Sequence, residues 1–330
     1  MLSTVSGCTG QLVEIAAGRA VEEKKMELMQ DGGIHVFLCG TGIPLSVKGR
    51  AGACTAVLAA GQFILVDTGQ GSWANIVEEQ LPVSRLSAIL LTHFHSDHIT
   101  ELGEAVTQSW MKGRSGTLDV YGAEGVEQVV AGFDAAYALD RKYRTAQYGS
   151  NMPGEAGRMQ AHTVKLPAAD EAAVVIEKNG LRVTAFAVDH QPAAPAYGYR
   201  FEYQGKVLVI SGDTSRSENL IKHASGADVL IHEVVAKHLV QRAADFLHNS
   251  GHLRFAEMAR DAQSNHTAAS EVVDVARQAK VKKLVLTHLA PALSPATPNF
   301  IMRWVFFDGF RTGFNGPVVF GTDGMWIHVQ

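Results

Sequence analysis

A histidine-rich turn between a buried strand and a helix constrains the fold of this chain more than any other feature of its sequence. Residues 86–91 form a short apolar run typical of a buried strand, and residues 99–111 predict a helix. The turn between them has the pattern H-x-H-x-D-H, made by His93, His95, Asp97 and His98. The first two histidines alternate on extended backbone and therefore point the same way, whereas the last two residues follow on the turn. Imidazole and carboxylate groups suit zinc, and four such ligands within six residues are too many for one tetrahedral ion, which suggests two metal ions.

Three more candidate ligands lie at the ends of other strand-like segments. His190, Asp213 and His288 each follow a short apolar run. Side chains on strand ends converge along one rim of a sheet, so compact packing is expected to bring these residues to the turn at His93. A site for two metals needs such additional ligands for each ion, and it usually has a bridging group.

Bulk composition limits the classes of function. The chain has 330 residues, of which 46% are hydrophobic, enough for a sizeable core. Its net charge of −4 does not indicate a nucleic-acid or membrane surface, and no apolar run approaches the length of a membrane span. Residues 1–18 lack the charged start and apolar centre of a signal peptide. We therefore expect a cytoplasmic protein, or a periplasmic one if a signal sequence has been removed.

The cysteines are few and scattered. Cys8, Cys39 and Cys54 are odd in number and unclustered, which predicts no disulfide framework and favours a reducing compartment.

The remaining pattern indicates one domain with a short lead-in. Residues 1–30 have little specified structure, apart from residues 21–25, which suggest a short helix or an exposed arm. From Ile34 onward strand and helix patterns alternate without repeats or a linker, so residues 31–330 are expected to form one domain.

Turn residues and apolar periodicity predict the principal elements of that domain. Predicted hairpins pair residues 53–58 with 63–66, 174–177 with 182–187, 197–203 with 206–210, and 317–320 with 325–329. Further strands are expected at 34–38, 117–122, 227–232 and 283–287, and helices at 73–81, 125–144, 236–263 (interrupted at 249–251), 267–279 with Thr267 or Asn265 as its cap, and 300–310. The loop at 43–52, with Pro44, Lys48 and Arg50, is expected to lie over the site.

An aromatic and basic segment lies near the end of the predicted helix 125–144. It contains Tyr137, Arg141, Lys142, Tyr143, Arg144 and Tyr148. This segment suits a solvated helix face or a dimer contact, and alternatively a wall of the catalytic pocket.

Taken in order along the chain, these motifs resemble the metallo-β-lactamase superfamily from about Ile34 to the C-terminus. The matching segments are Gly40-Thr41-Gly42, residues 66–69, the histidine-rich turn, His190, residues 211–214 and Thr287-His288. Within the superfamily the chain is most similar to the ribonuclease Z-like branch. Three local matches support this: His190 followed by residues 197–200, the segment 231–233, and the segment 265–268.

The resemblance implies an α/β (α+β) fold, a four-layer αβ/βα sandwich of two mixed sheets flanked by helices, with two Zn²⁺ between the sheets at one edge. By this resemblance one zinc is bound by His93, His95 and His190, the other by Asp97, His98 and His288, and Asp213 bridges them. Mn²⁺ or Fe²⁺ would accept the same ligands.

The resemblance also implies roles in catalysis for four residues. His266 contacts the anionic oxygen of the substrate or protonates the leaving group, and Glu233 orients it. Asp67 orients the histidine-rich turn at residues 93–98, which we call the metal loop. Asp97 contributes as a ligand close to the reacting atoms.

The substrate is harder to predict. The tRNA-processing members carry a long arm between the motifs that match His190 and Asp213, whereas residues 199–213 have room only for one hairpin. The loop at Pro44 also departs from the Pro-x-Lys-x-Arg-Asn form of those enzymes. We therefore expect a dizinc hydrolase of small-molecule phosphodiesters or sulfate esters, with no nucleic-acid or membrane partner and, by resemblance, a homodimer.

Alternative functions use the same metal core. A ribonuclease Z-type endonuclease that cleaves tRNA 3′ ends is an alternative that an arm placed elsewhere in the chain would revive, and a lactonase would also keep Asp213. Zinc lactamases commonly have Cys at that position, and iron-based redox relatives have a carboxylate where His95 stands. An inactive scaffold would have a broken ligand set, and all seven positions are intact here.

Overall fold

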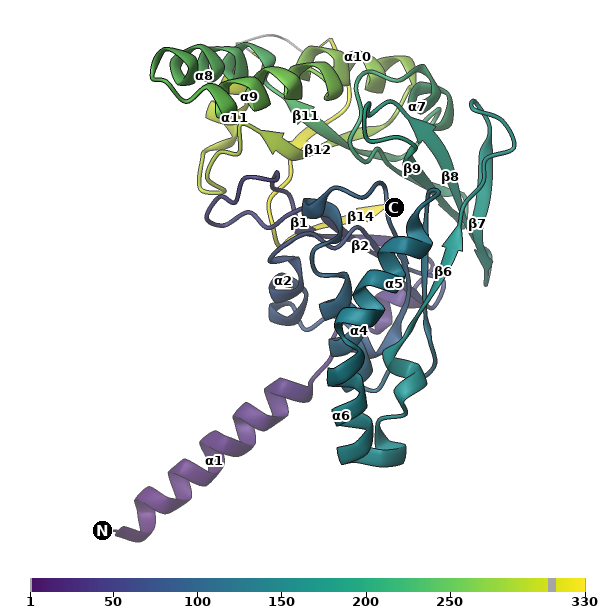
Figure 1. Ribbon diagram of the computed structural model, residues 1–330, viewed down its shortest axis with the longest axis vertical. Coiled ribbons are helices and arrows are strands. Elements are labelled where there is room, and N and C mark those ends of the chain that lie inside the picture. The colour runs from purple at the N-terminus through teal and green to yellow at the C-terminus, as the bar shows by residue number, and fades with distance from the viewer. Residues whose placement is uncertain (1, 308–312, 330) are drawn as a thin grey trace.

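Two mixed sheets of seven strands each form the centre of the computed structural model, which describes residues 2–307 and 313–329 (Figure 1). The first sheet has the order β14 (Met325–Val329), β1 (Ile34–Gly40), β2 (Cys54–Ala59), β3 (Gln62–Val66), β4 (Leu86–Leu90), β5 (Leu118–Gly122) and β6 (Met159–Thr163). The second has the order β13 (Val318–Phe320), β12 (Lys283–Ala290), β11 (Val229–Val235), β10 (Lys206–Ile210), β9 (Ala196–Tyr203), β8 (Leu181–Val188) and β7 (Ala172–Lys178).

Helices flank both sheets. They are α1 (Leu2–Val21), α2 (Ser72–Glu78), α3 (Ser96–Ile99), α4 (Leu102–Met111), α5 (Val126–Ala136), α6 (Ala138–Tyr148), α7 (Glu218–His223), α8 (Lys237–Asn249), α9 (Leu253–Asn265), α10 (Ala269–Gln278) and α11 (Asn299–Phe307).

Three apolar clusters define the four layers. One lies between the sheets and includes Val36 of β1, Val57 of β2 and Ile231 of β11, all fully buried. A second joins the first sheet to α2, α4 and α5, and a third joins the second sheet to α7, α10 and α11. Strands covered on both faces bury every residue, as β1 and β11 do, and this explains their nearly continuous apolar sequences. The predicted four-layer sandwich is confirmed.

Most predicted hairpins are also confirmed. Asn179 and Gly180 have positive φ values of 53° and 81° between β7 and β8, as the expected type I′ turn requires. The last predicted hairpin is wrong. β13 pairs with β12 in the second sheet and β14 with β1 in the first, so the chain crosses between sheets at residues 321–324. The N–H of Gly321 donates to Leu286 of one sheet, and that of Gly324 to Leu38 of the other. Two short apolar strands joined by a turn have the same sequence pattern whether they pair with each other or join different sheets.

Several helix predictions need correction. The first described segment is the 20-residue helix α1, which projects from the body, rather than a helix at 21–25 (Figure 1). The stretch 125–144 forms two helices, α5 and α6, separated at Tyr137. Ala268, not Thr267 or Asn265, precedes α10, and its N–H donates to Glu271. The last residues of the predicted helix 300–310 lie outside the described part of the chain. No described helix has the length and apolar character that crossing a bilayer demands.

The prediction about cysteines is also wrong. Cys39 and Cys54 form a disulfide between β1 and β2, with Cα atoms 5.1 Å apart. The antiparallel register shifts at the end of this pair, between Leu38 and Gly40, and this irregularity brings together two residues 15 positions apart. Cysteine count therefore gives no argument for a reducing compartment.

Candidate metal centre

All seven candidate ligands meet between the two sheets. His93 and His95 follow β4, and Asp97 and His98 lie in the short helix α3. The other three come from the second sheet: His190 after β8, Asp213 after β10 and His288 within β12. Among them only His95 is exposed to solvent. The structure thus brings every one of these positions into one cluster.

One side of the cluster consists of three imidazoles. His95 Nδ1 lies 2.9 Å from His93 Nε2 and 3.4 Å from His190 Nε2. His190 Nδ1 lies 2.9 Å from the carbonyl oxygen of Asn265, which can only accept, so Nδ1 carries the proton and Nε2 keeps its lone pair. This is the arrangement by which metal-binding histidines are oriented.

The other side combines two imidazoles and a carboxylate. Asp97 Oδ2 lies 3.2 Å from His288 Nε2 and 3.6 Å from His98 Nε2. His98 Nδ1 is 2.8 Å from Asp67 Oδ2, so that carboxylate fixes its proton and leaves Nε2 free. His98 Nε2 is fully buried and forms no hydrogen bond with any described residue. A buried imidazole nitrogen that faces two carboxylates without a hydrogen bond fits a metal ligand better than a core histidine.

Asp213 lies between the two sides. Its Oδ2 is 3.3 Å from His98 Nε2 and 3.4 Å from His288 Nε2, and 4.0 Å from the Nε2 atoms of His93 and His190. Burial alone would raise the pKa of Asp213, but the facing imidazoles of His288 and His98 hold it well below its usual range. A charged carboxylate within about 4 Å of imidazoles on both sides suits a bridge between two cations. The donor set as a whole, imidazole with carboxylate, fits two borderline-soft divalent ions.

Asp67 orients the metal loop through hydrogen bonds. Besides His98, it accepts hydrogen bonds of 2.8 Å from both the N–H and the hydroxyl of Thr92. Gly69 allows this close packing, because a Cβ there would lie 2.1 Å from the carbonyl oxygen of Asp97. The role of Thr92 was not foreseen, although its position directly before His93 was a signal.

His266 lies beside the cluster rather than in it. Its ring is 5.1 Å from that of His190 and stacks on His288 at 5.4 Å. Its Nδ1 is 3.3 Å from Glu233 Oε2, and the other oxygen of Glu233 accepts from the N–H of Thr267 at 2.8 Å. Burial alone would lower the pKa of His266, but the Glu233 carboxylate raises it to about 9. A protonated imidazole next to the candidate metal ligands can donate a proton to a leaving oxygen.

The Arg50 side chain of the loop at 43–52 packs into the body of the protein. This side chain is buried, and it donates to the carbonyl oxygens of Leu293 and Gly321 and to the hydroxyl of Thr41. Arg50 therefore ties the loop to the body and cannot also bind substrate. Asp323, which accepts from Thr41 and Ala51, completes this network and was missed because nothing near it in sequence marks it.

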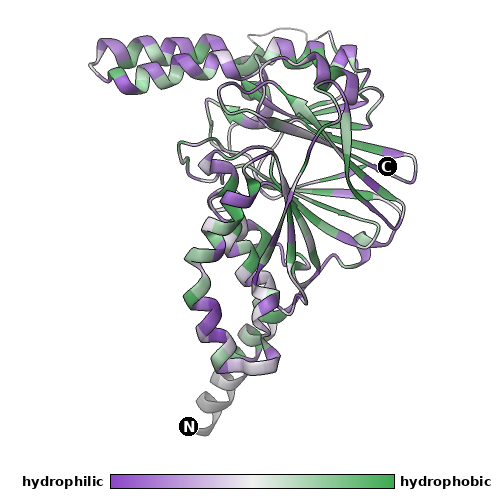
Figure 2. Cartoon of the chain, turned by 45° about the vertical axis from the view of Figure 1, so that its right-hand side comes forward, coloured by the Kyte–Doolittle hydropathy of each residue, from purple (hydrophilic) through white to green (hydrophobic). Residues whose placement is uncertain are grey.

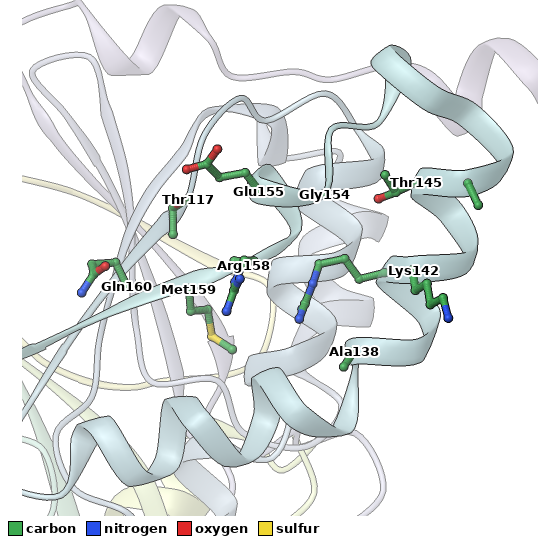
Figure 3. Close-up of a pocket in the computed structure, with 11 residues that line it drawn as sticks. Thr117, Ala138, Lys142, Thr145, Gly154, Glu155, Arg158, Met159 and Gln160 are labelled. Atoms are coloured by element: carbon green, nitrogen blue, oxygen red, sulfur yellow. The ribbon is translucent and has the colours of Figure 1, made fainter.

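The segment 137–148 does not wall the catalytic pocket. Arg141, Lys142 and Arg158 line a separate cavity of about 740 Å³, together with Thr117 and Met159 (Figure 3). Thr117 and Met159 lie at the starts of β5 and β6, whereas the metal loop follows the carboxyl end of the parallel strand β4. The segment is thus at the opposite end of the sheet from the metal centre, and the prediction that it forms a pocket wall is wrong.

Comparison with known proteins agrees with this geometry. Residues 62–289 match the family model described as the beta-lactamase superfamily domain. The chain belongs to the metallo-β-lactamase superfamily. Its relatives place it in the ribonuclease Z-like branch. It is 31% identical over 293 residues to a protein named Ribonuclease Z from Mycobacterium bovis (strain BCG), covering 88% of this chain and 96% of the relative. It is 32% identical over 264 residues to the Ribonuclease Z of Mycobacterium marinum, covering 79% of this chain and 88% of the relative.

Solved structures share the fold. The short form of human tRNase Z superposes with a TM-score of 0.64 at 19% identity, covering 90% of this chain and 99% of that one. The metallo-β-lactamase fold protein YhfI from Bacillus subtilis gives a TM-score of 0.60 at 18% identity, with the same coverage. The protein is therefore a metal-dependent hydrolase of the metallo-β-lactamase superfamily, similar to ribonuclease Z.

Proposed function

We propose that this protein is a ribonuclease Z-type phosphodiesterase, which uses two zinc ions to cleave RNA near its 3′ end. The main support is the complete set of seven candidate ligands with the His266–Glu233 pair beside it. The chain also spans 96% of a relative named Ribonuclease Z. This proposal replaces the small-molecule substrate expected from the sequence, because the relatives favour the nuclease alternative.

The proposed ligand assignment follows the geometry. His93, His95 and His190 would hold one ion, and Asp97, His98 and His288 the other, with Asp213 as a ligand available to both. Two divalent ions bound there would supply a hydroxide at neutral pH and stabilise charge on the phosphoryl and leaving oxygens.

The protein residues have separate tasks in this proposal. Asp67 and the carbonyl of Asn265 keep the protons of His98 and His190 on Nδ1, so that both Nε2 atoms stay available. His266, with a pKa of about 9, carries a proton at neutral pH and gives it to the leaving oxygen. Glu233 holds His266 in position and stabilises its charged form.

A helical hairpin provides the arm that this function requires. Nothing projects between His190 and Asp213, but α8 and α9 extend from the body as an antiparallel pair (Figure 2). The hairpin carries exposed Arg242, Arg254, Phe246 and Phe255, and α9 leads directly into His266. Arginines that contact phosphates and aromatic rings on which bases stack are typical of RNA-binding surfaces. We propose that this hairpin contacts the RNA away from the cut.

A small-molecule diester or sulfate ester hydrolase is the second candidate. The single short hairpin between Tyr199 and Asp213 and the net charge of −4 favour it. A homodimer and a cytoplasmic location also stay proposals, the first testable by light scattering of the purified protein.

The deciding experiment is a substrate panel combined with metal analysis. We expect two zinc ions per chain and efficient cleavage of a precursor tRNA, with slower cleavage of bis(4-nitrophenyl) phosphate. Negligible cleavage of the tRNA with fast turnover of the aryl diester, 4-nitrophenyl sulfate or an acyl-homoserine lactone would overturn the nuclease and identify the small-molecule class.

A further inference from the structure

A small pocket of about 220 Å³ opens beside the metal loop, on the side of His93 and His95. Phe94, Pro192 and Pro195 and two alanines give it apolar walls, and Glu124 is its one acidic residue. It is smaller than the pockets that enclose a drug-sized ligand, about 300–1,000 Å³, so it suits one ring system rather than a whole nucleotide.

Glu124 is available to a ligand. It lies on the turn between β5 and α5, it is exposed, and among the described residues its carboxylate forms no hydrogen bond or ion pair. The turn is held close to the metal loop, since a Cβ at Gly122 or Gly125 would lie 3.3 Å from the ring of Phe94. The nearby hydroxyl of Tyr197 does not compete, because it donates to the carbonyl of Val164 at 3.0 Å. The Glu124 carboxylate therefore lies at the pocket and forms no competing interaction with the described residues.

The pocket does not include His266, the residue proposed to protonate the leaving group. His93 and His95 border it, whereas His266 and His288 do not. A free carboxylate repels phosphate, so the pocket does not suit the anionic part of the substrate. It suits the group that keeps the phosphate after cleavage, provided that this group is flat, apolar on its faces and able to donate hydrogen bonds.

We infer that this pocket binds the base of the nucleoside whose 5′-phosphate is retained, and that Glu124 makes it prefer guanine. Guanine presents two adjacent donors, N1–H and the N2 amino group, to the two carboxylate oxygens. Adenine and cytosine each present one amino group beside a ring nitrogen lone pair, and uracil presents one N–H between two carbonyls. The apolar walls contact the faces of the base, as in other single-stranded RNA sites. This inference rests on the proposed function and specifies its substrate.

The test uses the full-length, zinc-loaded protein and the four nucleoside 5′-(4-nitrophenyl) phosphates, which share one leaving group. We expect kcat/KM to be about tenfold higher for guanosine than for uridine, since a paired donor–acceptor contact discriminates by about this factor. Glu124→Gln, which offers one acceptor and one donor, should abolish the preference. Glu127→Gln, three residues along and outside the pocket, should keep it.

Binding provides a readout independent of turnover. By calorimetry, guanosine 5′-monophosphate should bind about tenfold more tightly than uridine 5′-monophosphate, and Glu124→Gln should equalise them. Equal affinities in the unaltered protein, or a guanine preference that survives Glu124→Gln, would overturn the inference. Negligible cleavage of precursor tRNA with the binding preference retained would instead refute the proposed function alone.

Discussion

The two halves of the metal centre are built in different ways. On the first sheet, four candidate ligands lie within six residues, and Asp67 and Thr92 orient them through short hydrogen bonds. On the second sheet, His190, Asp213 and His288 come from three strands, and their neighbours Glu233 and Asn265 come from still other segments. The first half is therefore set by local chain geometry, whereas the second exists only once the second sheet has formed. Asp213 contacts His98 and His93 of the first half, and further contacts join His95 to His190 and Asp97 to His288.

Removing Asp213 should have the largest effect. We expect Asp213→Ala to lower the metal content from two ions per chain and to reduce turnover by more than about 100-fold, because both sides lose their shared anion. Metal analysis and kcat for bis(4-nitrophenyl) phosphate would measure this. Asp189→Ala, which follows β8 in the same sheet and lies outside every ligand group, is the matched control. Two retained ions in Asp213→Ala would show that the three other ligands of each ion suffice without Asp213.

His266 tests whether the second half also supplies the proton. His266→Ala should keep both ions yet lose about 10²–10⁴-fold in the rate of RNA cleavage, the usual contribution of a general acid. The loss should be smaller for the nitrophenyl ester, whose leaving group needs little protonation. The exposed His252, in the turn of the α8–α9 hairpin, is the control when changed to Ala. Should metal content fall instead, His266 is a ligand and its assignment is wrong.

A substitution at Asp67, which orients ligands of the first half, distinguishes ligand orientation from catalysis. Asp67→Asn should weaken metal binding by about 10–100-fold, because the amide no longer holds the His98 proton as a carboxylate does. Glu233→Gln, its counterpart in the second half, should leave metal affinity unchanged and lower the rate. Zinc titration against a chelator distinguishes the two outcomes, and equal metal loss in both variants would contradict the division of roles.

The smallest expected effect lies outside both halves. Replacing Arg242 and Arg254 by Ala should raise KM for precursor tRNA severalfold and reduce the salt dependence of binding, with no change for bis(4-nitrophenyl) phosphate. An equal effect on both substrates would place these arginines in the folding of α8–α9 rather than in RNA binding.

Local patterns were reliable where short-range geometry decides the structure. The pattern H-x-H-x-D-H located the metal loop, and Asn179-Gly180 located a hairpin, because both depend on a few consecutive residues. The three ligands beyond the loop were candidates because each follows an apolar strand beside a strong metal motif. The family resemblance was needed to assign them to particular ions, since a lone histidine at a strand end has many ordinary roles.

Other features could not be predicted because they depend on which segments become neighbours. The apolar strands β13 and β14 suited a hairpin, yet they join different sheets. The cysteines gave no sign of pairing until the shifted register of β1 and β2 brought Cys39 to Cys54. The loop at 43–52 was expected to lie over the site, and only the folded chain shows that the guanidinium of its Arg50 is buried against carbonyl oxygens.

By itself, the sequence determined the chemical type of the site: which residues can bind metal, and that they follow apolar strands. Ligand chemistry is a property of side chains, and strand or turn formation is a property of a few consecutive residues. Tertiary structure alone decided which groups lie within reach of one another, including Glu124 beside the metal loop and the α8–α9 hairpin leading into His266. Such distances arise from the packing of two sheets, which no short stretch of the chain encodes.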